Sequence, residues 1–339
     1  MDVICEEREA RAVIRICLIA ALVAGSGISQ FQGPSRLAAS IKDGKTALLI
    51  YSSNGNDVGV LTRGAVLPLD LKTQFWSQGN CCLHQAIPSL SPDGGRIAYV
   101  RLASTKPRQE TINIYDRATA KEQEIFQSEV IWGVSWEPRG DRLAVVADKA
   151  SEPGHNLYLV DVASNSVSQV THGQIKLADR TYTVSNHGPP SWNSAGSQLA
   201  MELRIAGEQA ENSTSSIIVL LNLETNEFVR LSEGVDPAWS PSQDAIAFFE
   251  PSRKKCFTIK SDGREKKLLF ALGERGFPSR SALLLFPVVW SPDGRELLFH
   301  QWVDADLITD VYRLDLGRGK PRFLSRSEVQ VVNWRETKQ

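Results

Sequence analysis

A short motif recurs through the sequence at intervals of about 50 residues, a spacing typical of a structural repeat. Each copy begins with a large apolar residue, here called the anchor, continues through a turn and ends in a short apolar strand. The strand begins seven residues after the anchor in every copy. A constant offset of this kind restricts the chain to an architecture of equivalent units. The five anchors are Leu90, Trp136, Trp192, Trp239 and Trp290.

The turn in each copy has the composition of a type I β-turn. Residues Ser91–Gly94 and Ser291–Gly294 both read Ser-Pro-Asp-Gly, and the other copies keep part of this signal. Ser favours the first position of such a turn, Pro presets the second and Gly favours the fourth. We therefore assign the turns a role in geometry and no chemistry.

Two more strands are predicted after each strand–turn–strand unit. The third has an alternating pattern, as in "INIYD" (Ile112–Asp116) and "VYRLD" (Val311–Asp315), and a weaker fourth follows, as in "FVRLS". Four antiparallel strands in a unit of this length indicate a propeller blade. One blade cannot bury both of its faces, so blades must pack side by side around a ring.

The two ends of the chain complement each other. The last copy has Trp334 as its anchor and no strand after it, whereas residues Lys42–Ser53 supply a turn and a second strand without an anchor. Val58–Thr62 fits the third strand of this unit. The predicted fold is all-β: a six-bladed β-propeller of four-stranded antiparallel blades spanning 42–339, closed by a composite blade from both termini.

This pattern resembles the TolB-like six-bladed propellers, whose repeats carry a "WSPDGxxIAF" consensus and are distant relatives of WD repeats. The resemblance covers roughly residues 42–339, and it implies an exported propeller whose rigid ring displays loops for binding. TolB itself has an N-terminal α/β domain before its propeller, and none is expected here. Related propellers precede serine hydrolase domains, but this sequence has no Gly-x-Ser-x-Gly elbow.

Residues 1–29 have the order of a secretory signal peptide. Arg11 and Arg15 precede the apolar run Ile16–Val23, and small residues follow. The first ten residues are acidic, which is unusual for such a leader, and the alternative is a buried N-terminal helix. The apolar run is shorter than the roughly 20 residues that span a bilayer. We expect a cleaved or hydrophobic leader, a short linker at 30–41, a periplasmic or secreted location, and no membrane span in the mature chain.

The net charge and the cysteine content limit which classes of ligand and partner the chain is expected to bind. The net charge is −1 and the pI is near 6.5, so no nucleic-acid partner is expected, because such binders carry a basic excess. Beyond the leader lie Cys81, Cys82 and Cys256, an odd number. Cys81, Cys82 and His84 are close in sequence, but a structural zinc site needs four ligands. We expect a loop with thiols, leave a Cys81–Cys82 disulfide open, and predict no metal and no cofactor.

Unequal loop lengths point to one face of the ring as the binding face. The turns on one side are short and uniform, whereas several loops expected on the opposite side are long. Long loops on a rigid scaffold often carry binding residues. These loops are Arg101–Thr111, Thr171–Pro190, Arg204–Ser215 and Ala271–Phe286.

Aromatic and charged residues near this face are the candidate site. For any one of them ordinary loop packing is an alternative, but together they suit a peptide tail or a glycan. The candidate binding residues are Trp76, His84, Trp132, His187, Asp236, His300 and Trp302.

The predicted function is a non-catalytic, monomeric binding module for a protein or peptide partner in the cell envelope. The alternative is a metal-dependent propeller hydrolase or lyase that acts on a lactone or carbohydrate at the channel mouth. Asp236, Asp304 and Asp306 would then be candidate ligands, although no Asp-x-Asp-x-Asp loop supports calcium. No catalytic residue is assigned.

Overall fold

The computed structural model describes residues 46–52, 58–62, 65–69, 88–149, 152–178, 180–183, 188–206, 214–274, 277, 283–302, 309–327 and 329–336. These residues form strands and turns and contain no helix. They form six four-stranded sheets and one two-stranded sheet, all with antiparallel pairing. The predicted all-β, antiparallel class is therefore confirmed. No segment of this described part is a helix able to cross a membrane.

One sheet combines strands from opposite ends of the chain. Its strands are, in spatial order, β26 (Val329–Glu336), β1 (Thr46–Ser52), β2 (Val58–Thr62) and β3 (Ala65–Leu69). β26 and β1 run antiparallel, with Trp334 opposite Leu48.

The other five large sheets follow the chain order, and each is a simple meander. The first two consist of β4 (Ser89–Leu90), β5 (Arg96–Thr105), β6 (Arg108–Asp116) and β7 (Lys121–Ser128), and of β8 (Val130–Trp136), β9 (Arg142–Lys149), β10 (Glu152–Asp161) and β11 (Val167–Gln169). The third consists of β14 (Ser191–Trp192), β15 (Gln198–Ala206), β16 (Thr214–Asn222) and β17 (Glu227–Glu233). The last two consist of β18 (Val235–Trp239), β19 (Ile246–Phe249), β20 (Lys255–Ile259) and β21 (Lys267–Ala271), and of β22 (Leu283–Trp290), β23 (Glu296–Trp302), β24 (Thr309–Asp315) and β25 (Lys320–Ser327).

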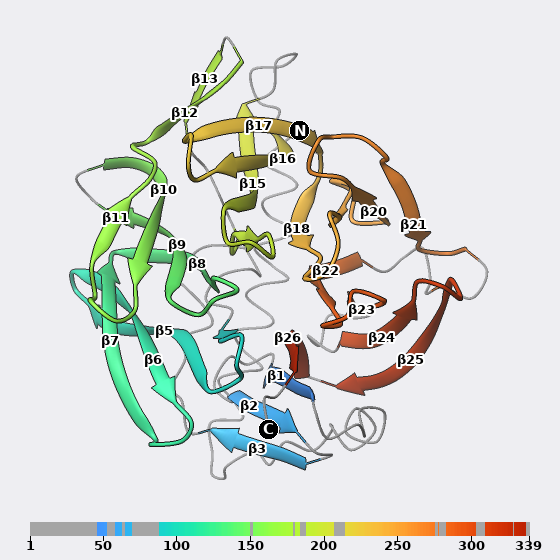
Figure 1. Ribbon diagram of the computed structural model, residues 1–339, viewed down its shortest axis with the longest axis horizontal. Coiled ribbons are helices and arrows are strands. Elements are labelled where there is room, and N and C mark those ends of the chain that lie inside the picture. The colour runs from blue at the N-terminus through green and yellow to red at the C-terminus, as the bar shows by residue number, and fades with distance from the viewer. Residues whose placement is uncertain are drawn as a thin grey trace, which may run out of the picture.

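The sheets are arranged around a common centre (Figure 1). First strands such as β8, β18 and β22 lie nearest the centre, and last strands such as β7, β11, β21 and β25 form the periphery. Each of these inner strands ends at its predicted anchor: β8, β14, β18 and β22 end at a Trp, and β4 ends at Leu90.

The predicted turns have the expected geometry. The backbone N–H of Gly94 donates to the carbonyl oxygen of Ser91 at 2.9 Å, and Gly294 donates to Ser291 at the same distance. Gly94 and Gly294 both have positive φ, at 71° and 69°, a conformation that costs glycine little. The turn sequence therefore specifies this local structure directly.

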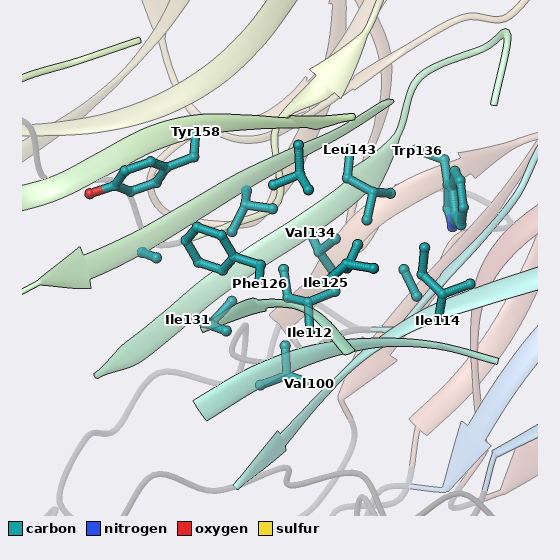
Figure 2. Close-up of a cluster of buried hydrophobic side chains, with 14 residues drawn as sticks. Val100, Ile112, Ile114, Ile125, Phe126, Ile131, Val134, Trp136, Leu143 and Tyr158 are labelled. Carbon is teal, nitrogen blue, oxygen red and sulfur yellow. The ribbon is translucent and has the colours of Figure 1, made fainter. Parts of the chain in front are cut away.

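The hydrophobic core lies between successive sheets. Second strands are buried on both faces, as in Ile97–Val100 of β5 and Leu143–Ala147 of β9, because each sheet packs between two neighbours. Figure 2 shows one such contact, in which Ile112 and Phe126 face Val134 and Leu143 of the next sheet. This packing explains why the second strands are continuous apolar runs rather than alternating ones.

Two segments that the sequence analysis treated as long loops contain regular structure. The Arg101–Thr111 segment lies mostly in β5 and β6, which extend as a hairpin whose pairing reaches Thr105 opposite Arg108. The Thr171–Pro190 segment contains a separate hairpin of β12 (Gln174–Leu177) and β13 (Arg180–Thr183). Both form because cross-strand pairing satisfies backbone groups that a loop would leave to water.

Candidate functional site

A cavity of about 390 Å³ lies at the centre of the molecule, among the innermost strands. Its wall is made of equivalent pieces of the six sheets: the five Trp anchors, the residues just before each anchor and, after the first five anchors, the second residue of the turn. Because turn residues such as Pro92, Pro138 and Pro292 line it, the cavity lies at the turn end of the inner strands. The candidate residues of the long-loop face are not among its described lining.

The cavity wall is apolar, with a few hydroxyl and amide groups. None of the described residues that line it is ionisable. They are the anchors Trp136, Trp192, Trp239, Trp290 and Trp334, the prolines Pro88, Pro92, Pro138, Pro189, Pro190, Pro237, Pro241, Pro287 and Pro292, and Ser89, Val134, Ser135, Ser191, Ser194, Ala238, Val288, Val289 and Asn333.

The anchor indoles are held by the neighbouring sheet. The indole Nε1–H of Trp136 donates to the carbonyl oxygen of Ser89 at 2.9 Å, and that of Trp290 donates to Ala238 at 2.9 Å. Trp192 makes the same kind of bond to Ser135 at 3.3 Å. In each case the acceptor directly precedes the previous anchor. The indole N–H groups are thus used between sheets, and the rings contribute apolar surface.

Further bonds join the inner strands around the cavity. The backbone N–H of Leu90 donates to Oδ1 of Asn333 at 2.8 Å, which links β4 to the C-terminal strand β26. The backbone N–H of Trp239 donates to Oγ of Ser191 at 2.8 Å. These short polar side chains, one residue before an anchor, fix the spacing of the inner strands, so the cavity is preorganised.

Trp334 differs from the other anchors. Its side chain is buried, and its Nε1–H has no hydrogen-bond partner within the described part of the chain. A buried donor without a partner costs free energy, on the order of 1–3 kcal/mol. Oγ of Ser135, another residue of the lining, is also buried without a hydrogen-bond partner among the described residues, so the wall of the cavity contains two polar groups whose bonding is incomplete.

The structure describes only part of the candidate set. Trp76, His84 and His187 lie outside the described residues, as do Asp304, Asp306, Cys81 and Cys82. Trp302 is the last residue of β23. Trp132, Asp236 and His300 are all buried, and they lie in three different sheets.

Asp236 belongs to a buried group of charged side chains. Its carboxylate forms an ion pair with Arg253, and its backbone N–H donates to the carboxylate of Glu202 at 3.2 Å. Ser216 Oγ donates to the same carboxylate at 2.9 Å. Burial, and then the nearby charge of Asp236, raises the pKa of Glu202. The group joins the β14–β17 sheet to the β18–β21 sheet, a structural role for Asp236.

Trp132 packs against a histidine. Its ring stacks on His155 at 4.2 Å between centroids and 10° between planes, and Nε2 of His155 lies 3.9 Å from Oδ1 of Asp148. Burial raises the pKa of Asp148, and the neighbouring His155 opposes that rise. Trp132 also belongs to the core cluster between the β8–β11 and β14–β17 sheets.

His300 is fully buried in β23, and burial lowers the pKa of its imidazole to about 4. It occupies the tenth position after its anchor, where three other copies have Val100, Val146 and Phe249. Glu202 occupies this position in the remaining copy. Glu202 is not among the candidate residues predicted from the sequence, but a polar residue at this core position of the repeat is the signal by which it can be recognised.

The cavity residues had a clear sequence signal but received no functional role. The constant offset identifies the anchors, and the turn composition identifies the turn prolines, for which the sequence predicts only a role in geometry. Their grouping around one cavity depends on the closure of the inner strands into a ring-like arrangement, which no single copy reveals. Within the described residues, no group of three or more His, Cys, Asp or Glu side chains is arranged to hold a metal ion.

Comparison with known proteins identifies the fold. No protein-family model matches the sequence, and no curated protein matches it. Among solved structures, TolB from Acinetobacter baumannii is similar with a TM-score of 0.60 at 14% identity, over 88% of this chain and 67% of that one. A putative TolB from Agrobacterium tumefaciens gives a TM-score of 0.53 at 13% identity, over 87% and 99%.

An enzyme is also similar. An oligogalacturonate lyase in complex with manganese gives a TM-score of 0.50 at 16% identity, over 84% of this chain and 75% of that one. These structures, together with the propeller domain of a trilobed protease from Pyrococcus furiosus, show that the chain has a β-propeller fold. One fold hosts both binding proteins and enzymes, so the function has to be argued from the site.

Proposed function

We propose that this chain is a six-bladed, TolB-like propeller that acts as a non-catalytic binding module, and that it takes an uncharged, extended segment of a protein partner into the central cavity. The six four-stranded sheets of the described chain support the blade count, and the pairing of β26 with β1 supports closure by a composite blade. The chain functions as a monomer in this proposal, because the pairing of β26 with β1 completes the composite blade within one chain.

The observation that carries the proposal is the chemistry of the cavity wall. Tryptophan rings and prolines dominate it, and no ionisable side chain is among its described residues. General acid–base catalysis needs a titratable group within hydrogen-bond reach of the substrate. A wall of aromatic rings and prolines instead provides flat apolar surfaces on which an extended segment packs, as in the aromatic grooves that bind proline-rich peptides.

The size of the cavity limits what it can hold. Its volume of about 390 Å³ is at the lower end of the range for small-molecule sites, which is roughly 300–1,000 Å³. A few side chains fit, but not a folded domain. In this proposal the Nε1–H of Trp334, which has no partner among the described residues, donates to a carbonyl oxygen of the bound segment. The Trp334 side chain would have to move slightly to expose this N–H.

The cellular setting of the proposal is the cell envelope. Residues 1–29, outside the described part, have the order of a signal peptide, which supports a periplasmic or secreted location for the mature chain. The TolB structures among its neighbours are consistent with this placement.

The test uses a variant that fills the cavity without disturbing the core. Ser194 is an exposed residue of the cavity lining, and Ser194→Trp would block the cavity. Ala195, its exposed neighbour in the same turn, is not part of the lining, so Ala195→Trp is the matched control. The probe is a labelled, uncharged peptide of alternating Pro and Leu, and the readout is fluorescence anisotropy with the purified chain.

Binding by the wild type and by Ala195→Trp, with at least a tenfold loss in Ser194→Trp, is the expected result. Equal binding by both variants would place the peptide elsewhere and remove the cavity from the proposal. Elemental analysis of the purified chain separates the alternative function. One divalent ion held per chain through dialysis against a chelator, with cleavage of a lactone or an oligogalacturonate, would replace the binding module by an enzyme.

A further inference from the structure

The β12–β13 hairpin has no counterpart in the other units of the described chain. It is inserted between β11, the last strand of one sheet, and β14, the first strand of the next. It projects at the periphery, and β12 lies close to β17, the outermost strand of the β14–β17 sheet (Figure 1). The hairpin therefore adds a second wall beside an edge strand.

Packing holds the hairpin in this position. Its alternating pattern buries Ile175 and Leu177, which are 4% and 7% exposed, in the core cluster that includes Trp192 and Leu203. Half-buried Tyr182 of β13 and Phe228 of β17 pack on the same cluster. Because the hairpin is anchored by two buried side chains of β12 and by half-buried Tyr182 of β13, its outer surface is preorganised.

A groove of about 540 Å³ separates the hairpin from β17. Its floor is apolar, formed by Leu177 and Tyr182 on one side and by Phe228 and Val229 on the other. Val229 is 55% exposed, the most exposed of the large hydrophobic side chains in the described chain. Exposed apolar surface inside a groove is a common feature of recognition sites.

The rim of the groove is positively charged. Arg180 of β13 and Arg230 of β17 line it, and none of its described lining residues is a carboxylate. Nη2 of Arg230 lies 3.8 Å from Oε1 of Glu233, and both side chains are exposed. Such a pair is weak and screened by solvent, so this guanidinium remains accessible to a stronger carboxylate partner.

The backbone supplies a third element of recognition. β17 is the last strand of its sheet, and its outer edge has no strand partner in the described chain. An unpaired edge presents a row of N–H and C=O groups to which an extended segment can add as a further strand. Main-chain bonds give affinity in this mode, and the alternate side chains give specificity.

We propose that the groove between the β12–β13 hairpin and β17 binds an extended segment of a partner protein in which acidic and apolar side chains alternate. In an added strand the apolar side chains lie over Val229, and the carboxylates, which point to the opposite face, pair with Arg180 and Arg230. This surface is separate from the central cavity, takes a segment of opposite chemistry, and does not depend on the function proposed for the cavity.

The test uses a labelled, acetylated and amidated peptide of three Glu-Val repeats, its Lys-Val counterpart, and trigalacturonate as an acidic carbohydrate. Binding to the full chain is measured by fluorescence anisotropy, or by competition for trigalacturonate, at low and high salt. The groove variants are Arg180→Glu combined with Arg230→Glu, and Val229→Asp. Matched controls are Arg264→Glu, at an exposed arginine in a turn, and Leu268→Asp, at an exposed apolar residue of the outer strand β21.

The Glu-Val peptide should bind the wild type and both controls, more weakly as salt rises, and at least tenfold more weakly in each groove variant. All substituted residues are exposed, so thermal unfolding should remain that of the wild type. No binding of the Glu-Val peptide, equal binding of the Lys-Val peptide, or an equal loss in the controls would overturn the proposal. Binding of trigalacturonate alone would replace the peptide by an acidic carbohydrate. The Ser194→Trp variant should bind the Glu-Val peptide normally, which separates this proposal from that for the cavity.

Discussion

The residue at one equivalent position of the repeat differs between copies, and so do its contacts. The tenth position after the anchor is buried in every copy and holds Val100, Val146, Glu202, Phe249 or His300. The two polar residues are not equivalent. Glu202 accepts hydrogen bonds from Ser216 and from the backbone of Asp236, whereas the ionisation of His300 is governed by burial.

The burial of His300 predicts a loss of stability in mild acid. Its folded pKa, about 4, lies below its ordinary value of 6.5, so the unfolded chain binds a proton that the folded chain does not. The stability is therefore fully present above pH 6.5 and falls as the pH drops toward 4, by up to about 3 kcal/mol. Urea unfolding at several pH values measures this slope. His300→Gln should flatten it, whereas His172→Gln, at an exposed histidine, should leave it unchanged; an unchanged slope in His300→Gln would contradict the assignment.

At Gly133 of β8 the chain that leads to β14 passes so close that we expect no side chain to be tolerated. A Cβ atom there would lie 2.6 Å from backbone atoms of Pro189 in the next crossover. Backbone cannot move aside as a flexible side chain can, so Gly133→Ala should lower the free energy of unfolding by about 1–3 kcal/mol. Gly188→Ala is the control, because a Cβ at that position meets nothing within 4 Å. Equal stabilities of the two variants in urea unfolding would refute the close contact.

At the scale of elements, side chains that reach from one turn to the next hold successive sheets together. Nη2 of Arg96 donates to the carbonyl oxygen of Gly140 at 2.9 Å, and Nη2 of Arg142 donates to Gly196 at 3.2 Å. Each guanidinium also lies over the next anchor ring, 4.7 Å from Trp136 or 5.6 Å from Trp192. In both cases an arginine of one sheet contacts the turn and the anchor ring of the next sheet. The pattern of apolar residues in the sequence does not reveal this contact.

We expect the contacts of Arg142 with Glu137 and with the next turn to require a guanidinium group. Its Nε and Nη2 donate to the two carboxylate oxygens of Glu137 at 3.0 and 2.8 Å, and the Glu137 side chain is only 4% exposed. Lysine keeps the charge but cannot make both bonds, so Arg142→Lys should cost about 2 kcal/mol. Arg264→Lys, at an arginine that is 84% exposed, should cost almost nothing. Chemical denaturation compares the two, and a wild-type midpoint for Arg142→Lys would show that the second bond contributes little.

At the scale of the whole molecule, the two ends of the chain meet in one sheet. β26 pairs with β1 along its length, and Asn333 of the same strand accepts a bond from Leu90. The C-terminal strand is thus in contact with two sheets made from the N-terminal third of the described chain. Contacts between residues far apart in sequence form slowly during folding. Because β26 contacts sheets at the other end of the chain, we also expect unfolding to be cooperative.

Removal of β26 should therefore affect the whole fold. A chain that ends at residue 328 exposes the edge of β1 and loses the bond to Leu90, so it should have a lower Tm and a tendency to aggregate. A chain that ends at residue 336 retains all of β26 and is the control. Thermal unfolding and light scattering measure both effects. A chain ending at 328 with the Tm of the control would rule out closure through β26.

The repeat, the four-strand unit and the turns can be predicted from the sequence, because they depend on local preferences: Pro and Gly in a turn, apolar runs in strands, and a constant offset from the anchor. The sequence also indicates that the last anchor and the first strands belong together, and the structure pairs them. The burial of Trp132, Asp236 and His300, the hairpin within Thr171–Pro190, and the cavity between anchors and prolines become evident only in the folded chain. These features depend on which segments, distant in sequence, pack against one another, as Leu90 and Asn333 do, and local propensity contains no information about such contacts.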